Sequence, residues 1–130
     1  MNYKNTRKII GINLVLFALL YGFISLNKEI LRPGFSHIPS AQILMGSFPN
    51  FIAACSITLM FVNGVLIKKP ENGRFIVYAG SVLVFAILAI EELIPMWGAS
   101  TYYDPLDIWA SGLGSIASII TYELMARKAR

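Results

Sequence analysis

The sequence predicts an all-α membrane protein, a bundle of four transmembrane helices that forms a single domain over residues 1–130. Of the 130 residues, 56% are hydrophobic and only 14% are charged. The mean hydropathy of +0.64 is far above that of a soluble domain of this size. Four apolar stretches each come close to the roughly 17 to 25 residues that cross a bilayer as a helix. The expected spans are 9–26, 48–67, 75–93 and 108–125.

The first span, 9–26, follows a basic start that contains Lys4, Arg7 and Lys8. The same pattern opens secretory signal peptides, so cleavage is the alternative to a first helix. Signal peptides have a shorter apolar core and a cleavage site between small residues, and "ISLNKEILRP" offers no such site. We therefore expect an uncleaved transmembrane helix.

The connection to the second span is the longest of the chain. Its Pro33-Gly34 pair predicts a turn, and residues 39–45 could form one short helix at the membrane interface. Ser47 is expected to cap the second span, with Pro49 in the first turn, where a missing N–H costs no helix hydrogen bond. Asn63, in the middle of that span, is expected to hydrogen-bond to another helix.

The third span, 75–93, ends in the adjacent carboxylates Glu91 and Glu92. Steps of three and four residues place Glu92 on one face with Tyr78 and Ser81, so we expect this face to point into the bundle. The face behind Glu91 has no polar side chain that would favour the bundle interior. It contains Val77, Gly80, Val84 and Ile87.

The fourth span, 108–125, follows a predicted helix start. Asp104 is expected to cap the helix, Pro105 suits the first helical position, and Asp107 is an acid in the first turn. One face of this helix carries small and polar residues, a spacing that allows close helix contact in membranes. This face, on which another helix of the bundle should pack, contains Asp107, Ser111, Gly114, Ser118 and Tyr122.

The basic residues predict the topology, because cytoplasmic segments of membrane proteins are enriched in Lys and Arg. Only Lys28 and Arg32 of the eleven bases lie in the first connection, and none lies in the third. Both termini and the turn "KKPENGR" are therefore expected to be cytoplasmic. The other nine bases are Lys4, Arg7, Lys8, Lys68, Lys69, Arg74, Arg127, Lys128 and Arg130.

The candidate site lies at the outer ends of the third and fourth spans, where four of the seven acids gather. The candidate ligand-binding residues are Glu92, Asp104, Asp107 and Ser111, while Gly114, Ser118 and Asn63 are expected to pack helices. His37 has no second His or Cys at metal-ligand spacing, so no metal and no cofactor are expected. The bases lie at span ends and form no surface that would bind nucleic acid.

The order of residues from Glu92 to Gly114 resembles the VanZ-like family of small membrane proteins. That family has a glutamate at a helix end, a loop with a basic residue, two acids three apart, an asparagine and a glycine. Glu92, Asp104, Asp107 and Gly114 match, while Ser111 replaces the asparagine and the loop "MWGASTYY" lacks the arginine. The likeness covers about a quarter of the chain. It implies a role at the outer envelope, where the family is associated with low-level teicoplanin resistance.

Three functions remain open from the sequence. The first is a non-catalytic protein of the bacterial cytoplasmic (inner) membrane, whose outward acidic mouth contacts an envelope glycolipid or a glycopeptide antibiotic. The second is a scaffold or accessory subunit that docks another membrane protein through its small-residue helix face. A homo-oligomer is left open beside these functions. The third is an enzyme or carrier with Glu92 and Asp107 as acid and base. Since the sequence shows no nucleophile paired with a base and no phosphate loop, we expect no enzyme.

Overall fold

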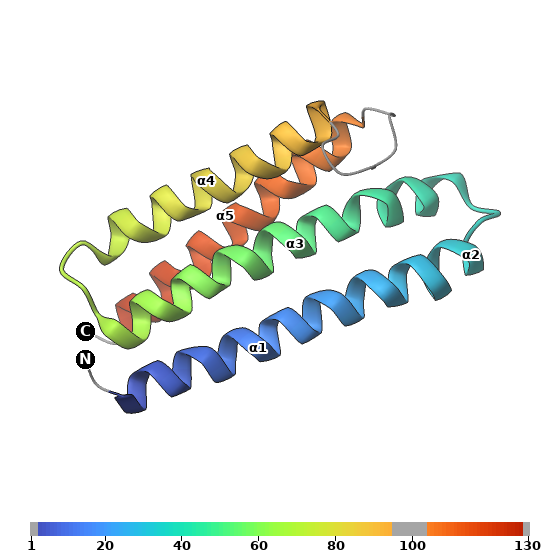
Figure 1. Ribbon diagram of the computed structural model, residues 1–130. Helices are drawn as coiled ribbons and strands as arrows, with labels where there is room; N and C mark the ends of the chain where they lie inside the picture. Colours follow the sequence, from blue (N-terminus) through green and yellow to red (C-terminus); the bar gives the residue numbers. More distant parts are fainter. Residues whose placement is uncertain (1–2, 95–103, 129–130) are drawn as a thin grey trace.

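A computed structural model of the chain describes residues 3–94 and 104–128. Every regular element in these two ranges is a helix, which confirms the all-α prediction (Figure 1). The elements are α1 (Tyr3–Leu26), η1 (Asn27–Leu31), α2 (Arg32–Gly34), α3 (Pro39–Lys68), α4 (Gly73–Leu93) and α5 (Pro105–Lys128). Part of the connection between α4 and α5 falls outside the described residues.

Three of these helices are long and apolar enough to cross a membrane: Lys4–Gly34, Pro39–Lys68 and Gly73–Leu93. They contain the first three expected spans. The fourth expected span, 108–125, lies within α5, which is a 24-residue helix but is not among these three. Its acids and hydroxyl side chains reduce its hydropathy, although its length would suffice to cross a bilayer core.

The prediction of a separate short helix at 39–45 is wrong, because α3 runs without interruption from Pro39 to Lys68. Ser47 lies inside this helix, where its hydroxyl donates to the Ile43 carbonyl at 3.4 Å and caps nothing. Pro49 is also inside α3. It has no N–H to offer the carbonyl of Met45, four residues earlier. The side chain of Asn27 donates to this Met45 carbonyl instead, at 2.9 Å, which explains how the helix tolerates the proline.

The first connection is much shorter than predicted. The chain continues from α1 through the π-helical turn η1 into α2, so Pro33 and Gly34 end a helix and the turn follows at 35–38. A π-helical turn holds one more residue than an α-helical turn. It brings Asn27, which is 1% exposed, against α3, and Arg32 then donates to the Gly46 carbonyl at 3.2 Å. These two side-chain bonds hold the two arms of the α1–α3 hairpin together.

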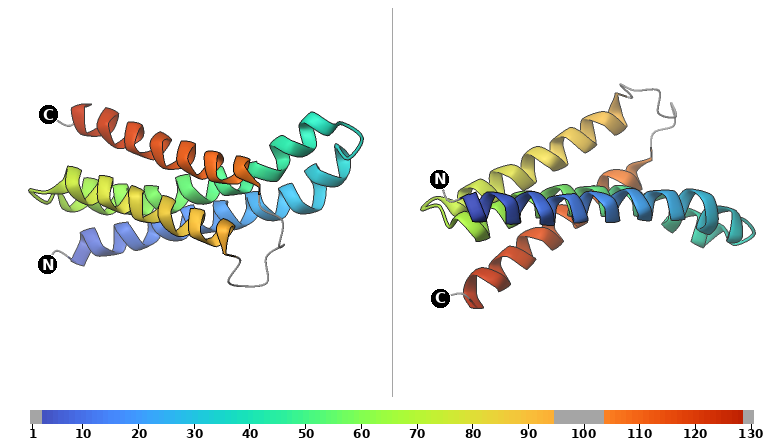
Figure 2. Two further views of the ribbon diagram at one scale, coloured as in Figure 1. Left: turned by 90° about the horizontal axis from the view of Figure 1, so that it is seen from above. Right: turned by 60° about the horizontal axis from the view of Figure 1, so that its bottom comes forward.

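The four long helices do not form a symmetric bundle. Helix α3 contacts α1, α4 and α5, whereas α1, within the described residues, makes no helix–helix contact with α4 or α5. The α1–α3 hairpin also extends beyond the far ends of α4 and α5 (Figures 1 and 2). The start of α1, the end of α5 and the turn between α3 and α4 lie together at the opposite end. The structure thus brings the three basic segments of the sequence to one end of the molecule.

The core lies where α3, α4 and α5 meet, near the end that holds the termini. Its buried cluster consists of Val62, Val65, Val77 and Tyr122. Nearby, the Arg74 side chain donates to Glu123 at 2.7 Å, and the Tyr78 hydroxyl donates to the same carboxylate at 3.0 Å. These bonds tie the start of α4 to the end of α5.

Candidate functional site at the ends of α4 and α5

Glu92 joins the end of α4 to the start of α5. Its Oε1 accepts a hydrogen bond from the backbone N–H of Asp104 at 3.0 Å, although twelve residues separate the two. The expected proximity of Glu92 and Asp104 is therefore real. Among residues 3–94 and 104–128, no group of three or more His, Cys, Asp and Glu side chains could hold a metal ion.

Asp104 caps α5 as the sequence predicts. The helix starts at Pro105, and Asp104 Oδ1 accepts from the backbone N–H of Leu106 at 2.9 Å, the second helical position. In a capping box, the acid at the third helical position accepts the N–H of the capping residue. Here Glu92 of the preceding helix accepts that N–H, so Asp107, which occupies the third position, is free to turn elsewhere.

Capping predicts a graded response at Asp104. Asp104→Asn and Asp104→Ser keep an oxygen that can accept the Leu106 N–H, so both variants should keep the stability of the wild-type protein. Asp104→Ala removes the acceptor and should lower the free energy of unfolding by about 1 kcal/mol. Denaturant-induced unfolding in a mild detergent measures the difference. Equal loss in all three variants would contradict a capping role.

Asp107 turns toward α3. It occupies the third position of α5, and its carboxylate lies beside the polar side chains of Ser47 and Asn50 of α3. Among the described residues, the buried Oδ1 atom of Asp107 has no hydrogen-bond partner. Asp107 thus has a buried carboxylate oxygen that could accept a further hydrogen bond.

Ser111 is placed differently from the expectation of a ligand-binding hydroxyl. It is 2% exposed, and its Oγ donates to the Asp107 carbonyl of its own helix at 2.9 Å. Serine and threonine hydroxyls in membrane helices commonly donate a hydrogen bond to the backbone carbonyl four residues earlier. Ser111 therefore packs α5 against its neighbours, and its hydroxyl hydrogen is already engaged.

The Val77 face of α4, which has no polar side chain, also packs inside the molecule except at Ile87. Val77 is 0% exposed, Val84 is 5% exposed and Gly80 is also buried, whereas Ile87 is 53% exposed. A Cβ on Gly80 would lie 3.2 Å from the ring of Phe61 in α3. Small apolar residues let helices approach closely, so in a membrane protein the absence of polarity does not identify the lipid face. This face of α4 packs on α3.

The Glu92 face of α4 packs on α5. Tyr78 donates to Glu123, and Phe85 lies 3.4 Å from the position of a Cβ on Gly112. Glu92 itself bonds to Asp104. These three α4 residues are spaced seven apart, so they form one stripe along the helix. Both faces of α4 thus meet other helices, and the polar stripe faces α5.

The predicted packing residues hold helices together as expected. Gly114 lies against α3, where an added Cβ would overlap the Phe51 carbonyl oxygen. The Ser118 hydroxyl lies 2.9 Å from the Cys55 carbonyl, to which it can donate between helices. The side-chain amide of Asn63 donates to Asn13 of α1 at 2.8 Å. The small face of α5 therefore faces α3.

Several residues of these contacts were not identified from the sequence. Asn50 faces Asp107, and Asn13 is the partner of Asn63. Asn27 was assigned to a loop, but it is buried and bonded to Met45. Polar residues inside apolar helices were the available signal, because in a membrane such groups need partners. The partner of each could not be deduced without the packing of the helices.

Comparison of the chain with protein-family models, with curated proteins and with solved structures finds no match. The resemblance to the VanZ-like family therefore rests on Glu92, Asp104, Asp107 and Gly114 alone. In the structure, Glu92 and Asp104 share a hydrogen bond, whereas Gly114 lies two helical turns deeper and packs on α3.

Proposed function

We propose that this protein is a non-catalytic integral protein of the bacterial cytoplasmic membrane whose acidic cluster of Glu92, Asp104 and Asp107 contacts an envelope glycolipid or a glycopeptide antibiotic. Helix α5 forms the fourth span in this proposal. The proposal extends the VanZ-like resemblance with the positions of the matching acids. Asp104 shapes the cluster by capping, while Glu92 and Asp107 are the two acids that recognise the ligand.

One observation carries the proposal: the unpartnered Oδ1 of Asp107, at the start of α5 and beside two polar side chains of α3. A buried polar atom without a partner costs free energy, so its retention favours a ligand that donates to it. Glycolipids and glycopeptides both carry many hydroxyl and amide donors. The cluster lies where α4 ends and α5 starts, at the ends of these two helices that point away from the basic segments and short of the tip of the α1–α3 hairpin (Figure 1). This position supports its exposure to the envelope.

Removal of charge at Glu92 and Asp107 tests this role. Glu92→Gln keeps an oxygen that can accept the Asp104 N–H, and Asp107→Asn keeps the shape of the side chain, so both variants should fold. We expect both to lose the phenotype of the wild-type protein, measured first as teicoplanin susceptibility of a bacterial host. Glu91→Gln, one residue from Glu92, is the matched control and should retain it. Wild-type susceptibility in both variants, at equal expression, would reject the ligand role of the cluster.

We also propose that both termini and the α3–α4 turn are cytoplasmic. The fold supports a single side for these segments, because it gathers them at one end. Nine of the eleven bases belong to them, and basic residues are retained on the cytoplasmic side. The turn at 35–38 and the acidic cluster then face outward.

Labelling with a membrane-impermeant thiol reagent tests this topology. Ser36 and Asn72 are both exposed, the first in the α2–α3 turn and the second in the α3–α4 turn. In a Cys55→Ser background, Ser36→Cys should react in intact cells, whereas Asn72→Cys should react only after lysis. The reverse pattern would place the acidic cluster in the cytoplasm and contradict an envelope role.

The alternative function, docking of another membrane protein through the small-residue face of α5, loses its proposed surface. Gly114 and Ser118 of that face already pack against α3 within the chain. A partner would need another surface, such as the exposed side of α1. The acidic cluster is therefore the better-supported basis for a function.

A further inference from the structure

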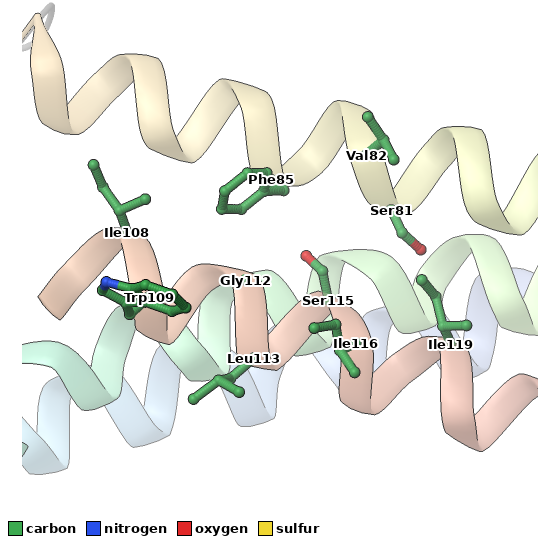
Figure 3. A pocket seen from close by; sticks show the side chains of 10 residues that line it. All are labelled: Ser81, Val82, Phe85, Ile108, Trp109, Gly112, Leu113, Ser115, Ile116 and Ile119. Atoms are coloured by element: carbon green, nitrogen blue, oxygen red, sulfur yellow. The ribbon is translucent and has the colours of Figure 1, made fainter. Parts of the chain in front are cut away.

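A groove of about 410 Å³ lies between α4 and α5, away from the acidic cluster (Figure 3). Its walls are apolar, with Phe85 from α4 and Trp109 and Ile116 from α5, and Gly112 lies between them. Trp109 is 72% exposed and Ile116 is 53% exposed, so the groove opens onto the outer surface of the helices. Its volume falls within the range of small-molecule sites, which runs from about 300 to 1,000 Å³.

Ser115 contributes an unused hydrogen-bond donor to this groove. The residue is only 5% exposed, and its Oγ has no hydrogen-bond partner among the described residues. In Figure 3 its hydroxyl points from α5 into the space toward α4. The hydroxyls of Ser81, Ser111 and Thr121 donate to the carbonyl four residues earlier, and that of Ser118 has the carbonyls of Cys55 and Gly114 within reach. Ser115 differs from these four, and its side chain is directed at the groove.

The position of Ser115 restricts the chemistry of an occupant. Ser115 is the eleventh residue of α5, about 15 Å from the helix start at about 1.5 Å per residue, and thus near mid-membrane if α5 spans. The polar groups of phospholipids lie in the interfacial layers, outside the hydrocarbon core of about 30 Å. A phospholipid would therefore place only its acyl chain in the groove and leave Ser115 without an acceptor. An occupant that satisfies this hydroxyl must bring an acceptor oxygen on an uncharged, apolar body.

We infer that the α4–α5 groove binds a neutral, membrane-soluble molecule with a carbonyl oxygen on a flat ring, of the quinone class, which accepts a hydrogen bond from Ser115 Oγ. The rings of Phe85 and Trp109 offer flat apolar surfaces for such a ring. Gly112 leaves the space that a side chain would fill, since a Cβ there would contact the Phe85 ring at 3.4 Å. None of these residues belongs to the acidic cluster, and the inference rests on the proposed function only in taking α5 as a span.

Two small molecules of nearly equal shape separate hydrogen bonding from simple apolar binding. Duroquinone has two ring carbonyls, whereas durene is the corresponding hydrocarbon without them. In purified protein with Trp97→Phe, duroquinone should quench the fluorescence of Trp109 in a saturable manner. Durene competes for the same groove and restores the fluorescence. Its dissociation constant should be about threefold to tenfold higher than that of duroquinone, because one neutral hydrogen bond supplies a factor of this size. Equal affinity of the two molecules would overturn the inference.

Three variants locate the binding. Ser115→Ala should weaken duroquinone binding about threefold to tenfold and leave durene binding unchanged. Thr121→Ala, which removes a hydroxyl of α5 that does not line the groove, is the matched control and should bind both molecules as wild type does. Gly112→Leu should abolish saturable binding of both by filling the groove. Unchanged binding in Gly112→Leu would overturn the inference even if Ser115→Ala failed to fold.

Discussion

Gly114→Ala should destabilise the protein by about 1 to 3 kcal/mol as overpacking, whereas Gly112→Ala should leave it as stable as wild type or slightly more stable. At Gly114 the new methyl group would overlap the Phe51 carbonyl and lie 3.0 Å from both Ala54 Cβ and Cys55 N. All three atoms belong to α3, and each is a backbone or Cβ atom that no rotamer change can move. At Gly112 the methyl group would meet only the Phe85 ring, at 3.4 Å.

The two glycines form a matched pair, because both lie inside α5 and both gain about the same helix propensity on change to alanine. Their difference in unfolding free energy, measured in a mild detergent, thus reports the contact with α3. Indistinguishable stability of the two variants would show that α5 does not approach α3 as closely as the structure has it. A larger side chain should widen the gap, so Gly114→Leu should be worse still.

Asn27→Ala should cost about 1 to 3 kcal/mol, because it leaves the Met45 carbonyl without a donor. No backbone N–H of α3 can replace this donor, because residue 49, four positions later, is proline and has no N–H. In a Pro49→Ala background, the new N–H at position 49 can bond to Met45. We therefore expect Asn27→Ala to cost less there, with a coupling of about 0.5 to 3 kcal/mol between the two positions.

Asn63→Ala provides the control for this double-mutant cycle. It breaks the bond to Asn13, which also joins α1 to α3, but no proline lies four residues after either partner. Its cost should be the same in the wild-type protein and in the Pro49→Ala background. Additive effects of Asn27→Ala and Pro49→Ala would mean that Asn27 does not compensate for the proline.

The sequence predicts the helices of this protein better than their ends and their faces. Apolar length is enough to locate the four long helices, and Asp104 and Pro105 locate the start of α5 to the residue, because capping is a local interaction. The start of α3 was misplaced because Pro49 is normally a sign of a helix start. Asn27, the side chain that compensates for this proline, lies 22 positions before Pro49 in the chain, so local sequence does not reveal it.

The candidate site was predicted in part for the same reason. The capping role of Asp104 follows from its neighbours, but the orientation of Asp107 depends on Glu92, which accepts the backbone N–H that Asp107 would otherwise accept. On α4, the polar and the apolar stripe both face helices, and only the packing shows that the first meets α5 and the second meets α3. Polarity alone could not assign either.

The unequal lengths of the helices have a consequence for the surrounding bilayer. The arm Lys4–Gly34 has 31 residues and α3 has 30, whereas α4 has only 21, so the hairpin is taller than α4 by about 14 Å at about 1.5 Å per residue. In a bilayer, lipids beside the α1–α3 hairpin would therefore contact longer helices than lipids beside α4 would. Tilting and local thickening or thinning of the membrane relieve such a mismatch. The tilt of a protein of this shape should thus change between membranes of short-chain and long-chain lipids.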